Sequence, residues 1–252
     1  MSDTVLSDLS DGVRTITLNR PAALNAMNTE LVDALAEAFE MANADPQTRV
    51  IIFTGAGKAF CAGADLKEKR VGVSPEQSRA NVERIQDVTR AMVLGDRLII
   101  GAINGWAVGG GFEWAIGCDL SIWAESAKAF FPEVEWGLFV TGGATAILPA
   151  LVGPAKTKEM MLLGQRYSAA ELLELGVAWR VVADTQLMRE AQDVARRIAS
   201  LPERAVQDMK AVLNKATYAD VETAMRLETD AAVRGSTDPA TADRIATFGQ
   251  SR

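Results

Sequence analysis

The sequence of 252 residues contains no histidine. This absence excludes a Ser-His-Asp triad, a Cys-His dyad and every zinc site that depends on imidazole ligands. Cysteine is also scarce: Cys61 and Cys118 form no CxxC pair, which predicts free thiols in a reducing compartment rather than a disulfide framework. Any catalysis therefore depends on carboxylates, Lys, Tyr, Cys or backbone amides, and no metal site is predicted.

Positive charge and long apolar runs are scarce as well. The 26 Lys and Arg residues against 33 Asp and Glu residues give a net charge of −7, which has the wrong sign for a general binder of nucleic acid or anionic membranes. No apolar run approaches the ~20 residues of a membrane span. The start, MSDTVLSDLSDG, lacks the basic and apolar segments of a signal peptide. We therefore expect a soluble, cytoplasmic protein.

The order of the expected elements predicts an α/β core followed by a helical C-terminal region. Short apolar or alternating runs indicate strands, whereas helical periodicity dominates after Gly142. The composition, 48% hydrophobic and 23% charged, is that of a globular protein. The expected strands are 13–19, 50–54, 97–103 and 120–123, and the expected helices after Gly142 are 143–152, 156–163, 169–175, 186–200, 203–216 and 221–233.

Two segments are rich in small residues and can expose backbone amides. FCAGAD, residues 60–65, follows a buried strand and a glycine-rich turn, and unscreened amides in such a turn can donate to an anionic oxygen. NGWAVGGGFEW, residues 104–114, places three glycines before a helix, where a backbone can approach a ligand closely. The second segment has neither the P-loop pattern nor the position of a dinucleotide-binding motif. A plain connection between a strand and a helix remains the alternative for the first segment.

Two glutamates accompany these segments. Glu113 lies three residues after Gly110, on the same face of the expected helix, and its alternative role is to complement the helix dipole. Glu133 follows Pro132 at another helix start among apolar residues, which disfavours a charged carboxylate and suits a general acid; the alternative is a solvated side chain. Amide pairs stabilise enolate oxygens and carboxylate pairs move protons, so the combination predicts enolate chemistry.

These segments resemble a known family. FCAGADLKE, AINGWAVGGGFEWAIGCDL and FPEVEWGL match, in order and spacing, the signatures of the crotonase (enoyl-CoA hydratase/isomerase) superfamily, and are most similar to enoyl-CoA hydratases. LNRPAALNAMN and GQRYSAAELLELGVAWRVV extend the resemblance over about residues 13–248. It implies an α/β fold, a crotonase-like spiral of ββα units with a helical C-terminal subdomain. The implied division is a core with an acyl-CoA site over residues 1–195 and a trimerisation region over 196–252, in a homotrimer or dimer of trimers.

The resemblance implies that the chain is an enoyl-CoA hydratase, a lyase of fatty acid metabolism. Such an enzyme adds water reversibly, in syn fashion, to a 2-enoyl-CoA and gives a 3-hydroxyacyl-CoA through an enolate. Glu113 would activate the water and Glu133 would protonate C2, while the amides of Ala64 and Gly110 hold the thioester oxygen. No cofactor is implied, because coenzyme A is part of the substrate. The implied substrate-binding residues are Ala23, Ala62, Asp65, Leu66, Lys67, Gly109 and Thr141.

The sequence departs from the hydratase pattern after the second glutamate. Val140 and Thr141 stand where hydratases usually have Pro and Gly, so the amide is kept but a β-branched side chain is added. Ala22 stands where a Lys often lies near the CoA phosphates. Isomerisation, decarboxylation or C–C cleavage through the same enolate therefore remain alternatives. A non-catalytic acyl-CoA-binding or RNA-binding relative is disfavoured by the net charge and the glutamate pair.

Aromatic residues are numerous near the presumed site. Packing in the core is one explanation, and an acyl pocket lined by aromatic rings is the other. The residues concerned are Trp106, Trp114, Trp123, Trp136 and Phe139.

Overall fold

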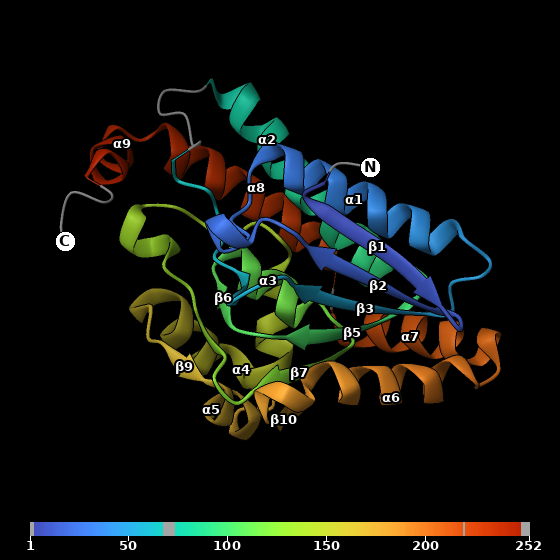
Figure 1. Cartoon of the computed structure of the whole chain (residues 1–252). Helices are drawn as coiled ribbons and strands as arrows, with labels where there is room; N and C mark the ends of the chain where they lie inside the picture. The colour runs from blue at the N-terminus through green and yellow to red at the C-terminus, as the bar shows by residue number, and fades with distance from the viewer. Residues whose placement is uncertain (1–2, 68–73, 219, 248–252) are drawn as a thin grey trace.

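A six-stranded sheet runs through the centre of the molecule (Figure 1), for which a computed structural model describes residues 3–67, 74–218 and 220–247. The strand order is β1-β2-β3-β5-β7-β10, in which β1 is antiparallel to β2 and the other neighbours are parallel. The strands are β1 (Val5–Ser10), β2 (Val13–Leu18), β3 (Val50–Gly55), β5 (Leu98–Ile103), β7 (Leu120–Ala124) and β10 (Arg180–Val182).

The apolar sequence of β3, VIIFTG, follows from its position in the middle of the sheet. All six of its residues are buried, because helices cover both faces of a parallel sheet. On one face, α6 (Leu187–Ala199) packs against β3, β5 and β7. On the other, the ring of Phe53 meets Phe39 from α1 (Thr29–Ala44) at 5.1 Å and Phe60 at 5.0 Å between centroids. The expected strand 50–54 is confirmed.

A second, smaller sheet has the order β4-β6-β8-β9. Each of its first three strands follows directly after a strand of the large sheet, and a helix comes next, so the unit β-β-α recurs as β3-β4-α2, β5-β6-α3 and β7-β8-α4. This recurrence is the expected spiral of ββα units. The elements are β4 (Ala59–Cys61), β6 (Trp106–Val108), β8 (Lys128–Phe130), β9 (Tyr167–Ser168), α2 (Pro75–Thr89), α3 (Gly110–Ile116) and α4 (Ala144–Leu163).

Local sequence signals explain the starts of several helices. The Asn28 side chain accepts from the amide of Leu31 and so caps α1, and Ser74 with Gln77 forms a capping box at the start of α2. Helix α4 joins the two expected helices 143–152 and 156–163 across a kink at Gly153, whose φ is +77°. The remaining short elements are η1 (Pro21–Ala23), the π-helical turn η2 (Arg90–Leu94), η3 (Glu133–Trp136), α5 (Ala169–Glu174) and η4 (Asp184–Gln186).

The C-terminal helices are α7 (Glu203–Thr217), α8 (Val221–Thr237) and α9 (Pro239–Ala246). Helix α8 packs against α2 and α4, and α9 packs against α8 and η3 (Figure 1). The predicted boundary between residues 195 and 196 falls within α6, and the division into a core and a trimerisation region stays a prediction. Among the described residues, no helix is both long and apolar enough to cross a membrane.

Candidate active site

A cavity of about 860 Å³ lies between the α/β core and the C-terminal helices. The core contributes the start of α1, the segment after β4, the start of α3 and the 3-10 turn η3, whereas α2, α8 and α9 close the other side. Both predicted glutamates line it. The predicted residues on its wall are Ala64, Asp65, Lys67, Gly110, Glu113, Glu133 and Thr141.

The backbone turn before α3 places Glu113 in this cavity. Gly109 adopts φ +52° and α3 begins at Gly110, so Glu113 lies in the first turn of the helix and is only 3% exposed. The amide of Thr141 donates to the two Glu113 carboxylate oxygens at 3.1 and 3.2 Å. The amide of Gly142 donates to Oε2 as well. A Cβ at Gly142 would lie 2.6 Å from that oxygen, so this contact requires glycine.

The surroundings of Glu113 raise the pKa of its carboxyl group well above the usual range. Burial is the largest cause, and the negative charges of Glu133 and Glu228 add to it, while the amides of Thr141 and Gly142 act in the opposite direction. A carboxyl group with a raised pKa is a better proton acceptor near neutral pH than an ordinary glutamate. Glu113 is therefore equipped to take a proton from water.

Glu133 enters the cavity from the first position of η3. Its Oε1 lies so close to Gly109 that a side chain at that position would overlap it. Gly109 is thus kept free of a Cβ both by its positive φ and by the Glu133 carboxylate. The negative charge of Glu133 contributes to the raised pKa of Glu113.

Two backbone amides of the cavity wall are available to a ligand. Met27 forms a short parallel bridge with Ala64, in which the Met27 amide donates to the Gly63 carbonyl at 2.8 Å and the Asp65 amide donates to the Met27 carbonyl at 3.1 Å. The amide of Gly109 donates to the carbonyl of Phe130 at 3.0 Å. Within the part of the chain that the structure describes, the amides of Ala64 and Gly110 make no backbone hydrogen bond. Ala64 and Gly110 both line the cavity, and a pair of amides without a backbone partner can hold an oxygen that becomes negative.

Not every residue predicted to bind substrate lines this cavity. Ala23, in η1, and Ala62, Leu66 and Gly109 are absent from the wall formed by the described residues. Asp65 lies on the wall and is held by Arg20, whose Nη1 is 3.1 Å from its Oδ2.

The aromatic residues near the site divide into two groups. Trp114 and Trp123 are 1% and 0% exposed and belong to the hydrophobic core, and Trp106 packs edge-on against Phe130. Phe139 lines the cavity. Two of the five aromatic residues thus pack in the core, and an acyl pocket lined by aromatic rings stays a prediction.

Helices α8 and α9 also contribute to the cavity wall, which was not predicted from the sequence. Ala232 and Ser236 from α8, and Ala242 and Ile245 from α9, line the same cavity as the glutamates. Small and weakly apolar residues in an amphipathic helix carry no signal that distinguishes a cavity wall from ordinary packing.

Comparison with known proteins agrees with this arrangement. The sequence profile of the enoyl-CoA hydratase/isomerase family matches residues 8–241. The chain belongs to the enoyl-CoA hydratase/isomerase family. Its resemblance to the crotonase superfamily is thereby confirmed, and members of this family include proteins with different named activities.

Two curated relatives show that range. A 1,2-epoxyphenylacetyl-CoA isomerase of Escherichia coli strain K12 is 36% identical over 234 residues, which cover 91% of this chain and 89% of the relative. A crotonyl-CoA hydratase of Syntrophomonas wolfei is 34% identical over 230 residues, covering 91% and 88%. Among solved structures, an enoyl-CoA hydratase/isomerase from Mycobacterium paratuberculosis superposes with a TM-score of 0.93 at 29% identity, covering 98% of this chain and 99% of that one. The crotonase fold is thus confirmed, together with membership of an enzyme superfamily.

Proposed function

We propose that the protein is a 2-enoyl-CoA hydratase that adds water reversibly to give a 3-hydroxyacyl-CoA. The observation that carries this proposal is the placement of Glu113, Glu133 and the free amides of Ala64 and Gly110 on the wall of one cavity. A relative named crotonyl-CoA hydratase supports it. The reaction needs no separate cofactor, since coenzyme A belongs to the substrate.

In the proposed reaction, Glu113 removes a proton from water and the hydroxide adds to C3 of the conjugated thioester. The electron pair of the C2–C3 double bond moves toward the thioester carbonyl, whose oxygen becomes an enolate held by the amides of Ala64 and Gly110. Glu133 gives its proton to C2 and restores the carbonyl. The proton on Glu113 then returns to Glu133 through water before the next turnover, so that one water is added in total.

The segment at 62–67 is the proposed entrance for the CoA moiety. Asp65 and Lys67 lie on the cavity wall beside Ala64, and the resemblance also assigns Ala62 and Leu66 to this end of the substrate. Ala23 and Gly109 stay predictions for substrate contacts. Gly109 shapes the site through its contact with Glu133 rather than as part of the wall.

A second reaction is favoured by Thr141. Its amide, which in hydratases helps to hold the water, donates to both oxygens of Glu113. When the Thr141 amide is engaged by Glu113, the amides of Ala64 and Gly110 together with Glu133 can instead support another enolate reaction, such as the shift of a double bond. A relative named 1,2-epoxyphenylacetyl-CoA isomerase agrees with this alternative.

The deciding experiment follows the absorbance of the conjugated thioester of crotonyl-CoA with purified protein. The proposal predicts rapid loss of absorbance that is nearly abolished in Glu133→Gln, with binding of CoA esters retained. Thioester binding without loss of absorbance in the wild type would reject hydration and favour the alternative reaction. Loss of absorbance in a Glu113→Ala/Glu133→Ala double variant at the wild-type rate would reject the assigned site.

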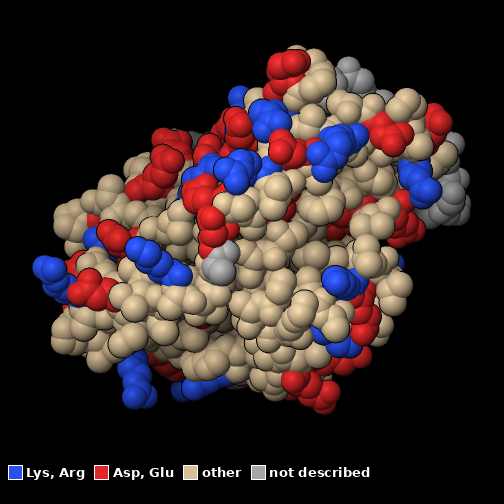
Figure 2. Space-filling view, turned by 180° about the vertical axis from the view of Figure 1, so that it is seen from behind, with Lys and Arg blue, Asp and Glu red and all other residues tan. Residues whose placement is uncertain are grey.

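We also propose that the chain assembles with copies of itself, as a trimer or a dimer of trimers. Apolar side chains stand exposed on α7 and at the end of α4, where Val212 is 65% and Leu163 73% exposed. Figure 2 shows a broad uncharged surface in the middle of the rear face, with charged side chains along its upper part and its margins. Such apolar exposure is typical of interfaces between protein chains. Light scattering should give a multiple of the chain mass, and Val212→Glu should lower it; a monomeric wild type would contradict the proposal.

A further inference from the structure

The segment from Thr141 to Thr145 leads from the loop after η3 into the first turn of α4, and most of its peptide groups have hydrogen-bond partners. Its first two amides donate to Glu113, as described above. Its carbonyls face the other way, toward α2: Gln86 Nε2 donates to the Thr141 carbonyl at 3.1 Å, and Thr89 Oγ1 donates to the Gly142 carbonyl at 3.2 Å. The orientation of these peptide groups is therefore determined from outside the segment.

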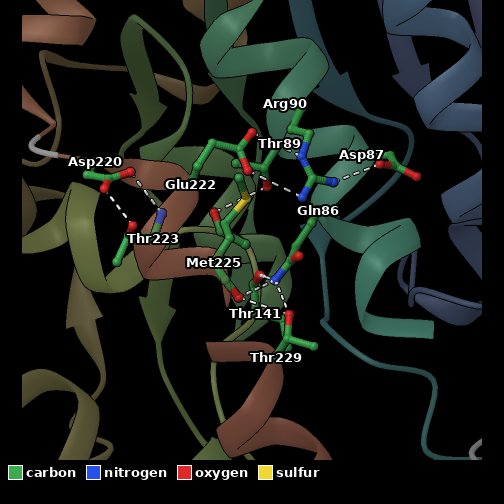
Figure 3. A network of polar contacts seen from close by, with 11 residues as sticks. Gln86, Asp87, Thr89, Arg90, Thr141, Asp220, Glu222, Thr223, Met225 and Thr229 are labelled. Atoms are coloured by element: carbon green, nitrogen blue, oxygen red, sulfur yellow. Dashed lines mark hydrogen bonds and ion pairs between the residues drawn. The ribbon is translucent and has the colours of Figure 1, made fainter. Parts of the chain in front are cut away.

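Gln86 is the centre of this attachment. It is 2% exposed, and its Nε2 also donates to the Met225 carbonyl and to Thr229 Oγ1, both at 2.8 Å. Figure 3 shows the Gln86 side chain between the ribbon of α2, the α8 residues and Thr141. One amide group thus joins α2, α8 and the segment that contacts Glu113.

Glu228, from α8, holds the other end of the segment. Its Oε2 accepts from the amide of Gly143 at 2.7 Å, and its Oε1 accepts from the amide and the hydroxyl of Thr145 at 2.8 and 2.7 Å. Gly143 is the N-cap residue of α4 and has no side chain to satisfy the first amides of that helix. Glu228 therefore does from a distant helix what an N-cap side chain does locally.

The Glu228 side chain is buried, which is unusual for a charged residue. Glu228 is 1% exposed, and the loss of solvent raises the pKa of its carboxyl group while the Thr145 and Gly143 groups oppose the rise. A buried carboxyl group is costly unless it is fully hydrogen-bonded. Glu228 does not line the cavity, so its cost is not explained by contact with a ligand.

We propose that Glu228 and Gln86 are positioning residues for the reaction, which hold the amides of Thr141 and Gly142 in the orientation that fixes the Glu113 carboxylate. The proposal rests on the proposed function for the identity of the reaction. Neither residue touches the reacting atoms. Together they make α2 and α8, which lie outside the central sheet, necessary for the geometry of the site.

The test compares Glu228→Ala with Glu222→Ala. Glu222 lies on the same helix and pairs with Arg90 of the π-helical turn that continues α2, at 3.1 Å, but it does not touch the segment. Glu228→Ala should lower kcat for crotonyl-CoA by roughly 10- to 100-fold with KM little changed, because misplaced catalytic groups affect the transition state more than substrate binding. Glu222→Ala should stay close to the wild type in both constants.

Hydrogen exchange provides the readout that a general loss of stability would not reproduce. At a temperature where circular dichroism shows each variant folded, Glu228→Ala should exchange the amides of Thr141 and Gly142 faster, while the amides of β3 stay protected. Gln86→Ala should give the same local pattern. Glu228→Gln, which keeps one acceptor oxygen, should recover part of the rate and part of the protection.

A folded Glu228→Ala with wild-type kcat and unchanged exchange at 141–142 would overturn the proposal. If this variant does not fold, Glu228→Gln decides, and unchanged kcat and exchange there would overturn it too. Exchange needs no turnover. Absence of hydration by the wild type would therefore reject the proposed function, whereas the exchange pattern still tests whether Glu228 orients the segment.

Discussion

Glu113 and Glu228 come from two different regions of the molecule and approach the same segment from opposite ends. Glu113 belongs to the α/β core, accepts from the amides of residues 141 and 142, and lines the cavity. Glu228 belongs to the C-terminal helices, accepts from the amides of residues 143 and 145, and is buried away from the cavity. Glu113 is therefore a carboxylate available to a substrate, whereas both carboxylate oxygens of Glu228 accept hydrogen bonds within the protein.

The largest expected effect comes from replacing the carboxylate that lines the cavity. Glu113→Gln keeps the side-chain shape but removes the proton acceptor, and kcat should fall by roughly 10²- to 10⁴-fold. Steady-state kinetics with crotonyl-CoA measures the loss, and Glu228→Gln is the matched comparison. If Glu228→Gln were the more damaging of the two, the distinction between a reacting and a supporting carboxylate would be wrong.

The same variant should be more stable than the wild type at neutral pH. The pKa of Glu113 is raised in the folded protein, so the folded state holds this proton more tightly than the unfolded chain, whose glutamate pKa is about 4.3. The stability that the protonated Glu113 carboxyl contributes is then complete below the unfolded pKa and is lost as pH rises through the folded pKa. The difference in Tm between Glu113→Gln and the wild type should therefore increase between about pH 4 and about pH 8. A constant difference over the range would show that the carboxyl is not perturbed.

Gly142 lies at the point where the two regions meet. A Cβ there would come within 2.6 Å of Glu113 Oε2 and 3.0 Å of Thr89 Oγ1, so Gly142→Ala should move the carboxylate. We expect a loss of roughly 10- to 100-fold in kcat. Thr141→Gly is the control, since it removes a side chain but keeps both amides. Equal losses in the two variants would mean that the side chain of Thr141 matters as much as the fit at Gly142, and would contradict this prediction.

A smaller effect is expected on the wall of the cavity. Phe139 is 40% exposed and lines the cavity, so Phe139→Ala should weaken contact with the acyl group by about 1 kcal/mol, or roughly fivefold in KM. Val134→Ala is the control, because Val134 is similarly exposed and absent from the wall formed by the described residues. A change in kcat rather than KM for Phe139→Ala would place this ring nearer the chemistry than the structure does.

The smallest effect is expected at the outer contact between α2 and α8. The Arg79–Asp230 pair spans 2.8 Å, but both side chains are 45% exposed. Asp230→Asn should therefore lower the free energy of unfolding only slightly, and this loss should vanish at high salt. Urea unfolding at low and high salt measures it, with kcat expected to stay at the wild-type value. A large loss of activity would show that surface pairs, and not Glu228 and Gln86, carry the positioning.

Residues that act through local sequence were predictable. The apolar run of β3, the cap at Asn28 and the glycines before Glu113 follow from neighbouring residues alone. Strands β4, β6, β8 and β9 were missed because segments of two or three residues carry no periodicity.

The part of the site that depends on distant contacts was not predictable. Glu228 has the sequence position of an ordinary polar residue of an amphipathic helix, and only the docking of α8 onto α2 and α4 reveals that it is buried. Thr141 was singled out by its place in the pattern. That its amide is already engaged by Glu113 required the three-dimensional arrangement.

The cap that Glu228 provides for α4 also orders events during folding. Glu228 lies 85 positions after Gly143 and 83 positions after Thr145 in the sequence. Closing so long a loop has an entropic cost that local structure does not offset. During synthesis the central strands can pair before α8 has left the ribosome, but the amides at 141–145 stay without their full set of partners until it docks. A chain that ends before Glu228 is therefore expected to build the sheet and to lack a finished site.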